Sequence, residues 1–438
     1  QATLFDEAEM RRINVFDWND DVKGFGRIMK QGGFDCVIGN PPYIKIQVLQ
    51  EFQPKEVDYL KKKYFSASSR SIDIYVIFIE KALDLISKDG LIGYICPHKF
   101  LNSNYGKNIR TIISGEKNLV KILNFGINQV FEKATTYTCL LFLSGCSQEN
   151  FEYFEFKNNI PNLKEVIEKG LSFFKIKSEQ NVTENWIFTS PENQELLKKI
   201  KFCNPSLGEI TTNIFQGPKS GADPVFIVNV PEFSNKQSKC YSKSLDNLFY
   251  IESDILKPYV KGKNVRRYYI QRNNEFIIFP YTDDGGLIPE KDLKKNFPLA
   301  FEYLSNHVNK KILISREKGR FKEIWWSFSR PQNMQILDRK KIITPFNAFH
   351  SSFSFDDDGD FVFSAGVSGA YGVLLKEEIN IDYKYLLGIL NSSLLEKYLK
   401  IISTALRGSY YSFENKYIKQ LPIRTIDFSN PEEKAQHD

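Results

Sequence analysis

The stretch that decides the fold of the first half of the chain is Phe34-Asp35-Cys36-Val37-Ile38-Gly39-Asn40-Pro41-Pro42-Tyr43. Its first six residues are mostly apolar and partly β-branched, which predicts a buried β-strand. The Asn-Pro that follows is a common turn dipeptide and ends the strand. A polar turn directly after a buried strand lies at the carboxyl edge of an α/β sheet, where such proteins bind their ligands.

Helix and strand patterns alternate after this stretch. Apolar residues at i, i+3 and i+4 spacing predict a helix over 72–86. Apolar runs predict three more buried strands, at 91–96, 120–125 and 137–143. Strands separated by helices predict an α/β layered sheet.

The character of the sequence changes after Gly145. Residues 146–205 are polar, and we place the domain linker there, with the boundary at 185/186. From Leu207 on, short strand-like runs alternate with turns, and a helix is predicted over 383–402. The sequence therefore predicts an α/β domain in residues 1–185 and an α+β domain in residues 186–438.

The residues after the first strand suit the methylation of a planar amino group. The side-chain oxygen of Asn40 can accept one N–H of such a group, and the backbone carbonyl of Pro41 can accept the other. A proline ring fixes φ near −65° and holds that carbonyl in place. The Tyr43 ring offers a surface on which a base can stack. We therefore predict that Asn40, Pro41, Pro42 and Tyr43 are catalytic.

Composition limits the class of protein. The chain has 438 residues, of which 42% are hydrophobic and 26% charged, as in ordinary globular proteins. No apolar run is long enough to cross a membrane, and the N-terminus has no signal-peptide pattern, so we expect a cytoplasmic protein without a membrane partner. The six cysteines form no C-x-x-C pair, and no metal site is predicted.

Positive charge is concentrated in the middle of the chain. Residues 201–345 hold 24 Lys and Arg against 15 Asp and Glu. A basic block suggests a polyanion such as nucleic acid, while solvated surface lysines are an equally open alternative. Lysine suits phosphate contact, and arginine can also read guanine. The candidates for DNA contact are Lys261, Lys263, Arg266, Arg267, Arg272, Arg316, Arg320 and Arg330.

The stretch from Phe34 to Tyr43 resembles the catalytic motif of amino-group methyltransferases that use S-adenosylmethionine. It is most similar to the adenine-N6 DNA methyltransferases of type II (IIG-like) restriction-modification systems. The resemblance continues, in that family's order, through 73–83, 90–101 and 125–143. The second half resembles the family's TaqI-type C-terminal specificity domain at 216–221, 226–228, 386–392 and 421–423.

The resemblance implies a fold, a cofactor and a partner. The fold would be a partial Rossmann-like methyltransferase sheet followed by an α+β target-recognition domain. The cofactor would be S-adenosylmethionine, contacted by Asn40 and by Asn14 or Asp17. The partner would be double-stranded DNA, with the target adenine flipped out and stacked against Tyr43 and Phe131.

One departure from the family concerns the cofactor loop. Members with this motif order carry a Gly-rich turn before the Asn-Pro-Pro-Tyr, but here the only G-x-G in that position is Gly24-Phe25-Gly26. We therefore expect an N-terminally incomplete methyltransferase domain, inactive alone, with a methyltransferase or nuclease segment missing upstream. Two alternatives remain open: a methyltransferase of RNA or protein glutamine, and a DNA-recognition module without catalysis.

Overall fold

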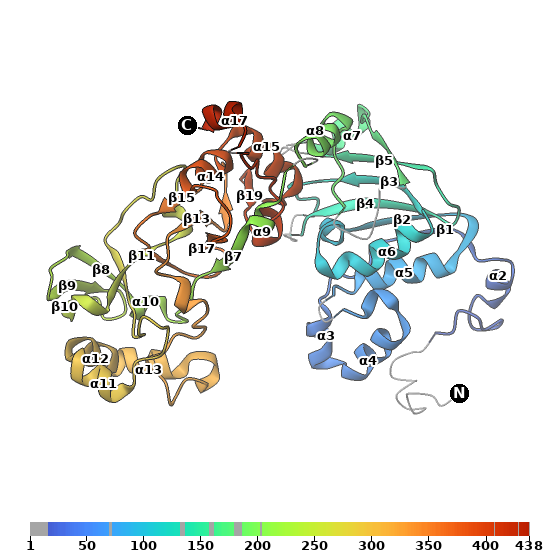
Figure 1. The fold of residues 1–438 in the computed structure, drawn as a ribbon. Helices are drawn as coiled ribbons and strands as arrows, with labels where there is room; N and C mark the ends of the chain where they lie inside the picture. Colours follow the sequence, from blue (N-terminus) through green and yellow to red (C-terminus); the bar gives the residue numbers. More distant parts are fainter. Residues whose placement is uncertain are drawn as a thin grey trace. The chain divides into compact units, whose positions relative to one another are not determined.

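The computed structural model describes residues 16–69, 72–131, 136–156, 162–178, 186–201, 204–406, 408–427 and 429–437. Two compact units make up the chain, Gln1–Gln194 and Glu195–Asp438 (Figure 1). The first unit is an α/β sheet and the second is α+β, which confirms the predicted fold class. The boundary placed at 185/186 from the sequence stays a prediction.

The first unit is built on one six-stranded sheet with the order β1-β2-β4-β3-β5-β6. Its strands are β1 (Phe34–Gly39), β2 (Ile86–Pro97), β3 (Leu119–Asn124), β4 (Thr138–Ser144), β5 (Asn150–Glu155) and β6 (Phe174–Lys177). β1, β2, β3 and β5 run parallel, and β4 and β6 run against them. The carboxyl ends of the four parallel strands therefore share one edge of the sheet.

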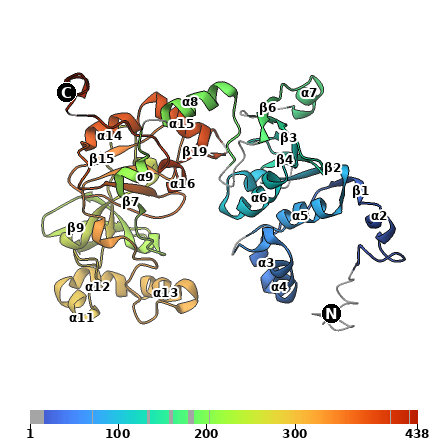
Figure 2. The ribbon, with the colours of Figure 1, turned by 45° about the vertical axis from the view of Figure 1, so that its right-hand side comes forward.

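Helices cover the sheet because their apolar faces match its alternating side chains. The helices of this unit are α2 (Gly26–Lys30), α3 (Ile46–Phe52), α4 (Pro54–Lys63), α5 (Tyr75–Leu85), α6 (Lys107–Gly115) and α7 (Leu163–Glu168), and α8 (Pro191–Lys201) spans the boundary between the two units. α5 and α6 lie on one face, where their buried side chains share a core with Ile92, Ile122 and Leu141 (Figure 2). This pattern is typical of an α/β layer.

The first strand is less buried than its sequence predicts. Among the described residues β1 pairs only with β2, so it lies at an edge of the sheet. Cys36 is exposed, and Ile38 keeps 82% of its surface exposed. The prediction of a buried strand is wrong here because a short apolar run does not reveal whether a neighbour covers both of its faces.

The strands also extend further than expected. The strand predicted at 91–96 begins earlier, and Lys88-Asp89-Gly90 lies inside β2, because Phe34 and Ile86 already begin the β1–β2 ladder. The polar stretch 146–205 was expected to hold the linker. It also supplies β5 and β6, and Lys121 of β3 pairs with Glu152 of β5 at 2.7 Å.

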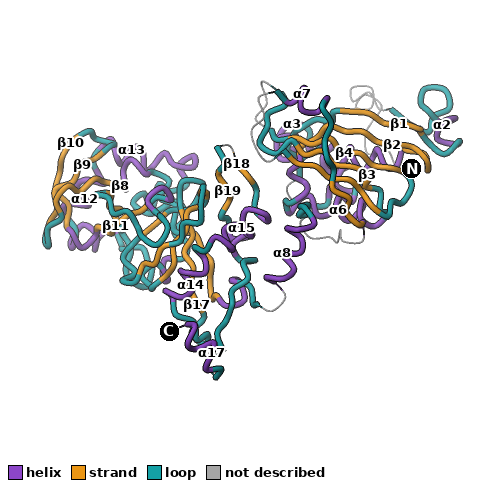
Figure 3. The backbone as a smooth tube through the Cα atoms, turned by 90° about the horizontal axis from the view of Figure 1, so that it is seen from above, coloured by secondary structure: helices purple, strands orange, loops and turns teal. Residues whose placement is uncertain are grey.

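The second unit holds three sheets (Figure 3). Their orders are β10-β9-β8-β12-β11-β16, β15-β13-β17-β7 and β14-β19-β18. The strands are β7 (Thr211–Gln216), β8 (Ile227–Glu232), β9 (Gln237–Ser242), β10 (Asn247–Glu252), β11 (Leu256–Val260), β12 (Glu275–Ile278), β13 (Lys341–Pro345), β14 (Asn347–Ala348), β15 (Ser354–Asp356), β16 (Val362–Phe363), β17 (Ala370–Leu375), β18 (Ala405–Leu406) and β19 (Tyr410–Ser412).

Helices and aromatic side chains pack together with the sheets of this unit. The helices are α9 (Leu207–Ile210), α10 (Asp223–Phe226), α11 (Glu290–Asn296), α12 (Pro298–Ser305), α13 (His307–Ser315), α14 (Tyr383–Leu390), α15 (Ser393–Ile402), α16 (Asn415–Ile418) and α17 (Pro431–His437). Tyr303 of α12 stacks on Phe249 of β10 with ring centroids 4.1 Å apart. Phe226 meets Phe328 edge to face at 5.0 Å in the core. Such pairs add to the burial of their apolar surface.

The helix predicted over 383–402 is two helices, α14 and α15. The break falls at Asn391 and Ser392. Asn391 is buried, and its side chain accepts from the backbone N–H of Phe353 (3.0 Å) and donates to its carbonyl (2.8 Å). The Ser392 hydroxyl caps α15 by accepting from Leu395 N–H at 3.2 Å. A contact with a distant strand therefore decides where the helix stops.

A buried ion pair joins β13 to the neighbouring strand β15, where Lys341 lies opposite Asp356. Lys341 Nζ donates to Asp356 Oδ2 (2.5 Å) and to the Leu337 carbonyl (2.6 Å), and neither charged side chain is more than 2% exposed. Burial lowers the pKa of Lys341 and raises the pKa of Asp356, and the attraction between the two groups opposes both shifts. Each buried charge is tolerated because the other one compensates it, and removing one partner would leave the other buried without a counter-charge.

Removing one partner of this pair should destabilise the second unit. We expect Lys341→Met to lower the free energy of unfolding by about 3–5 kcal/mol, because it leaves Asp356 charged and buried. The neighbouring Lys340 is exposed and pairs with Asp357 at 2.6 Å, so Lys340→Met is the matched control and should change stability little. Urea unfolding measures both, and equal effects would contradict the assignment.

Candidate active site and nucleic-acid interface

The predicted catalytic residues lie at the carboxyl edge of the first sheet. Asn40 follows β1, whose last residue, Gly39, pairs with Tyr94 of β2. Because the two strands are parallel, Asn40–Tyr43 lies beside the end of β2. Pro41 is buried and Asn40 is exposed. In the described part of the chain no hydrogen bond engages the Asn40 amide, so it is available to a ligand.

Tyr43 is anchored to the end of β2. Its hydroxyl donates to the Ile95 carbonyl at 3.1 Å, and its ring meets Tyr75 edge-on at 6.5 Å. Burial raises the pKa of Tyr43 to about 12, so the phenol stays neutral at ordinary pH. The ring is therefore a fixed surface beside Asn40.

His98, which sequence reasoning did not single out, completes this edge. It follows Pro97, the last residue of β2, and its Nδ1 lies 2.6 Å from Asn124 Oδ1 at the end of β3. Asn124 Oδ1 also accepts from Gly126 N–H (3.0 Å), and Asn124 Nδ2 donates to Glu155 Oε1 (3.3 Å). These partners fix the orientation of the Asn124 amide, because a backbone N–H only donates and a carboxylate only accepts.

The fixed amide also fixes the histidine. Nδ1 of His98 must carry the proton, since it faces an oxygen, and neutral His98 therefore presents Nε2 as an acceptor. Burial lowers the pKa of His98, although the hydrogen bond with Asn124 opposes this shift. A histidine after a strand-ending proline was the only signal in the sequence that could have pointed to this group.

The protonation state of His98 can be tested directly. We expect its imidazole to titrate below the ordinary value of 6.5 and to hold its neutral proton on Nδ1. Nitrogen-15 NMR of the imidazoles at several pH values measures both, with His98→Gln used to assign the signal. Asn124→Leu removes the acceptor and should free the tautomer; an Nε2-protonated His98 in the wild type would contradict the network.

Phe131 lies in the loop after β3, which leaves the sheet at the same carboxyl edge. It is half-buried, and its carbonyl accepts from Gln129 Nε2 at 3.0 Å. The loop leads to β4, whose first residue, Thr138, pairs with Pro97. The fold therefore brings Phe131, Tyr43 and His98 to one edge.

Of the two predicted cofactor-binding residues, Asn14 lies outside the described residues, and the structure does not place Asp17 beside Asn40. Asp17 is exposed and accepts from Asn19 N–H at 2.9 Å. Its neighbour Trp18 contacts Phe34, the first residue of β1, which is roughly 20 Å of strand away from Asn40 at the usual rise per residue. The structure therefore does not bring Asp17 to Asn40.

Gly24 and Gly26 lie too close to the neighbouring backbone to carry a side chain. A Cβ on Gly24 would lie 1.9 Å from the Asp17 carbonyl oxygen, and one on Gly26 would lie 2.4 Å from that of Asn19. The space around both glycines is taken by the protein's own backbone. Gly26 is the first residue of α2, so this segment is the turn that leads into a short helix.

Four of the predicted DNA-contacting residues line one groove in the second unit. Lys261, Lys263, Arg266 and Arg267 surround a groove of about 1010 Å³. The groove is also lined by His350 and by two exposed aromatic residues, Phe349 (47%) and Tyr410 (48%), and none of its lining residues is acidic. A positive groove with exposed rings suits a nucleic acid.

The prediction for Arg316 needs correction. Arg316 is 7% exposed, and its guanidinium donates to four backbone carbonyls, those of Leu313 (2.8 Å), Ser220 (2.7 Å), Ser327 (2.9 Å) and Trp325 (2.7 Å). Burial lowers its pKa to about 10. Arg316 joins three backbone segments and is not free to contact DNA. Arg272, Arg320 and Arg330 are exposed but lie outside the groove lining.

Variants of two neighbouring arginines separate these roles. We expect Arg316→Ala to lower the free energy of unfolding by about 2–4 kcal/mol, because four buried carbonyls lose their donor. Arg320→Ala should leave stability nearly unchanged, since Arg320 is exposed and its contacts, an ion pair with Glu317 at 3.5 Å and the Phe321 ring at 5.8 Å, lie at the surface. Denaturant unfolding measures both; a stable Arg316→Ala protein with weakened DNA binding would restore the original prediction.

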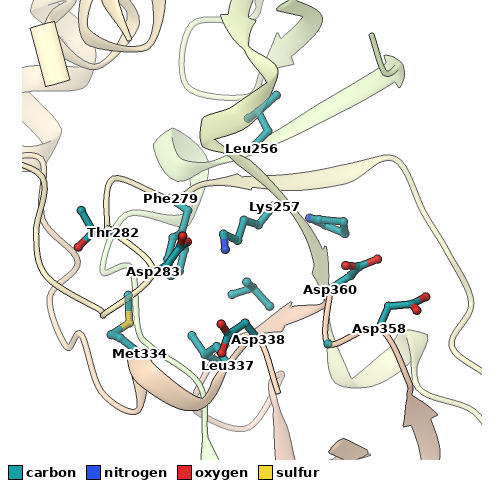
Figure 4. A pocket seen from close by; sticks show the side chains of 13 residues that line it. Leu256, Lys257, Phe279, Thr282, Asp283, Met334, Leu337, Asp338, Asp358 and Asp360 are labelled. Atoms are coloured by element: carbon teal, nitrogen blue, oxygen red, sulfur yellow. The ribbon is translucent and has the colours of Figure 1, made fainter. Parts of the chain in front are cut away.

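A second pocket in this unit has the opposite charge. It has a volume of about 270 Å³ and is lined by Asp283, Asp338, Asp358 and Asp360. Lys257 extends among these carboxylates (Figure 4), with its ammonium 5.2 Å above the Phe279 ring. Its acidic lining does not suit a phosphate backbone.

Two negative findings apply to the described ranges. No three His, Cys, Asp or Glu side chains there gather where they could hold a metal ion. Every helix there is too short or too polar to cross a bilayer.

Two family matches define the class of protein. Residues 3–131 match the Eco57I restriction-modification methylase family, and residues 257–423 match the TaqI-like C-terminal specificity domain. The chain is thus similar to a restriction-modification methylase in its first half and to a TaqI-like specificity domain in its second, which confirms the resemblance drawn from the sequence.

Its relatives are type II restriction-modification methyltransferases. The type II restriction enzyme and methyltransferase RM.Eco57I of Escherichia coli is 29% identical over 92% of this chain and 42% of its own length. The type II methyltransferase M.BstVI of Geobacillus stearothermophilus is 24% identical over 89% of this chain and 67% of its own. The chain therefore spans 42% of the first relative's length and 67% of the second's.

A solved structure shares the fold. It is the type IIL restriction-modification enzyme MmeI in complex with DNA, with a TM-score of 0.60 and 12% identity, covering 96% of this chain and 50% of that one.

Proposed function

We propose that the full-length protein is a site-specific DNA methyltransferase of a restriction-modification system. It would transfer a methyl group from S-adenosylmethionine to N6 of a flipped adenine. The observation that carries this proposal is the free Asn40 amide at the carboxyl edge of β1, beside the anchored ring of Tyr43. The family matches and the groove of the second unit support it.

The chemistry follows from what these residues can accept. The lone pair of the adenine amino group is conjugated with the ring and is a poor nucleophile. Asn40 Oδ1 and the Pro41 carbonyl would accept its two N–H bonds and hold the nitrogen toward the methyl donor. Tyr43 and Phe131 would stack against the flipped base, which offsets part of the cost of unstacking it, a few kcal/mol.

The cofactor would supply the electrophilic methyl group. Asn40 is the described residue that we assign to its neighbourhood. We assign the rest of the cofactor site to residues outside the described part; the distance of Asp17 from Asn40 supports this assignment.

The edge of β1 supports a contribution from another segment. Among the described residues one side of β1 is unpaired, and the side chain of Ile38 in this strand is 82% exposed. An open apolar strand edge is a template for a further strand. We propose that a further strand, from a segment outside the described residues, pairs with β1 here and that this segment carries most of the cofactor site. A protein that methylates genomic DNA would act in the cytoplasm, which is the location expected from the sequence.

Two alternatives have different support. The basic groove favours nucleic acid over a protein glutamine as substrate, but RNA would also fit its charge. A recognition module without catalysis would use the groove and leave Asn40 idle. Measuring which substrate is preferred and whether a methyl group is transferred therefore distinguishes the DNA methyltransferase, the RNA or glutamine methyltransferase and the recognition module.

The central experiment replaces Asn40 in the full-length protein. We expect Asn40→Ala to reduce methylation of duplex DNA by about 100-fold or more, by analogy with the loss of one preorganised polar group in other enzymes. DNA affinity should stay nearly the same, because Asn40 lies outside the groove. Transfer of labelled methyl groups and fluorescence anisotropy measure the two quantities.

The matched control is Asn150→Ala, which changes an exposed asparagine at the amino end of β5, on the opposite edge of the sheet. It should keep wild-type activity. Retained methylation in Asn40→Ala would refute the role of Asn40. Methylation of RNA in preference to DNA, or binding without any methyl transfer by the wild type, would favour the corresponding alternative.

A further inference from the structure

One carboxylate accepts hydrogen bonds from several residues that line the basic groove. Glu396 of α15 accepts from His350 Nδ1 (2.8 Å) and Lys400 Nζ (2.6 Å) at Oε1, and from Ser351 N–H (3.1 Å) at Oε2. Arg267 Nη2 also donates to Oε2. Burial works against ionisation of Glu396, but the hydrogen bonds from His350 and Lys400 outweigh it and lower its pKa to about 2. Glu396 is therefore a permanent anion.

One side of the Arg267 guanidinium is hydrogen-bonded to the protein, and its far end is not. Its Nε donates to the Ser351 carbonyl at 3.2 Å, and its Nη2 donates to Glu396. These two donors form one side of the planar guanidinium, so the two N–H bonds at its far end, one on each Nη, remain available. The side chain is 41% exposed in the groove lining. Such a pair of parallel N–H bonds matches a planar pair of acceptors.

The backbone under Arg267 is fixed as well. Arg267 lies in a tight turn closed by the pairing of Val265 with Ile270. Ser354 Oγ donates to the Arg266 carbonyl at 2.5 Å, and Tyr268 N–H donates to the Phe353 carbonyl at 2.9 Å. Tyr268 has a positive φ of 73°, a costly conformation that persists only where its surroundings enforce it.

The other cations of the groove are held differently. Lys261 pairs with Glu275 at 2.6 Å. Lys263 and Arg266 are exposed, and their side chains have no hydrogen bond or ion pair within the described residues. Flexible cations of this kind suit phosphate contact, which needs charge but no fixed direction.

We propose that Arg267 reads one guanine of the recognition sequence and that Glu396 is the positioning residue that aims it. Guanine presents N7 and O6 as adjacent acceptors in the major groove, and a bidentate arginine is their usual partner. This inference rests on the proposed binding of duplex DNA, but not on methyl transfer. A phosphate group would offer the same paired acceptors, so the test separates the two.

The test begins with the recognition sequence of the full-length protein, obtained by selecting bound duplexes from a random pool. Each guanine of that sequence is then replaced by 7-deazaguanine, which lacks N7 but still pairs with cytosine. We expect one replacement to weaken wild-type binding roughly 10-fold. Arg267→Ala should abolish that difference at that guanine alone, because it removes the donor to N7.

Variants of Glu396 and of its surroundings test the positioning role. Glu396→Gln keeps the size of the side chain and should reduce the 7-deazaguanine effect at the same guanine, leaving the other positions unchanged. Lys397→Gln, an exposed neighbour on α15, is its control and should behave as wild type. Arg266→Ala should weaken binding to all duplexes equally and lower the salt dependence by about one ion.

The outcomes are distinct. If Arg267→Ala keeps the full 7-deazaguanine effect, or weakens all duplexes equally with a smaller salt dependence, Arg267 contacts phosphate and the inference is overturned. A full effect in Glu396→Gln overturns the positioning role. Selective DNA binding without methyl transfer would refute the proposed enzyme but not this inference, whereas absence of sequence preference in the wild type would refute the inference itself.

Discussion

The parallel pairing of β1 with β2 is the constraint on which the candidate active site depends. The ladder runs from Phe34 opposite Ile86 to Gly39 opposite Tyr94. Because the strands are parallel, the turn after β1 and the residues after β2 leave the sheet at the same edge. The hydrogen bond from the Tyr43 hydroxyl to the Ile95 carbonyl then joins the turn after β1 to the end of β2. An antiparallel pairing would put Asn40 and His98 at opposite edges.

Buried cations hold the backbone together in both units. Arg110 donates to the Phe100 (2.5 Å) and Ser103 (2.8 Å) carbonyls, Arg316 to four carbonyls, and Lys341 to Asp356 and neighbouring carbonyls. Backbone carbonyls in loops have no ladder partner, and a buried guanidinium can satisfy several at once. The basic excess of residues 201–345 therefore overstates the charge that faces a ligand. Part of it is structural.

The groove of the second unit shows how a single acidic residue can serve a basic surface. Glu396 draws together side chains from a turn, a loop and a helix, and it limits their motion. Fixing a long side chain before binding lowers the entropy lost on binding. The groove thus combines mobile cations with one whose direction is set.

The sequence by itself determined the local features of this protein. It predicted the strand at 34–39, the turn Asn40–Tyr43, the α/β and α+β halves and four of the groove's cations, because strand patterns and turn residues act over a few positions. The tertiary structure decided what joins distant segments: His98 with Asn124, Arg267 with Glu396, the helix break at Asn391 and the burial of Arg316. Partners 26 to 129 positions apart leave no periodic signal, since only the folded chain brings them within hydrogen-bonding distance.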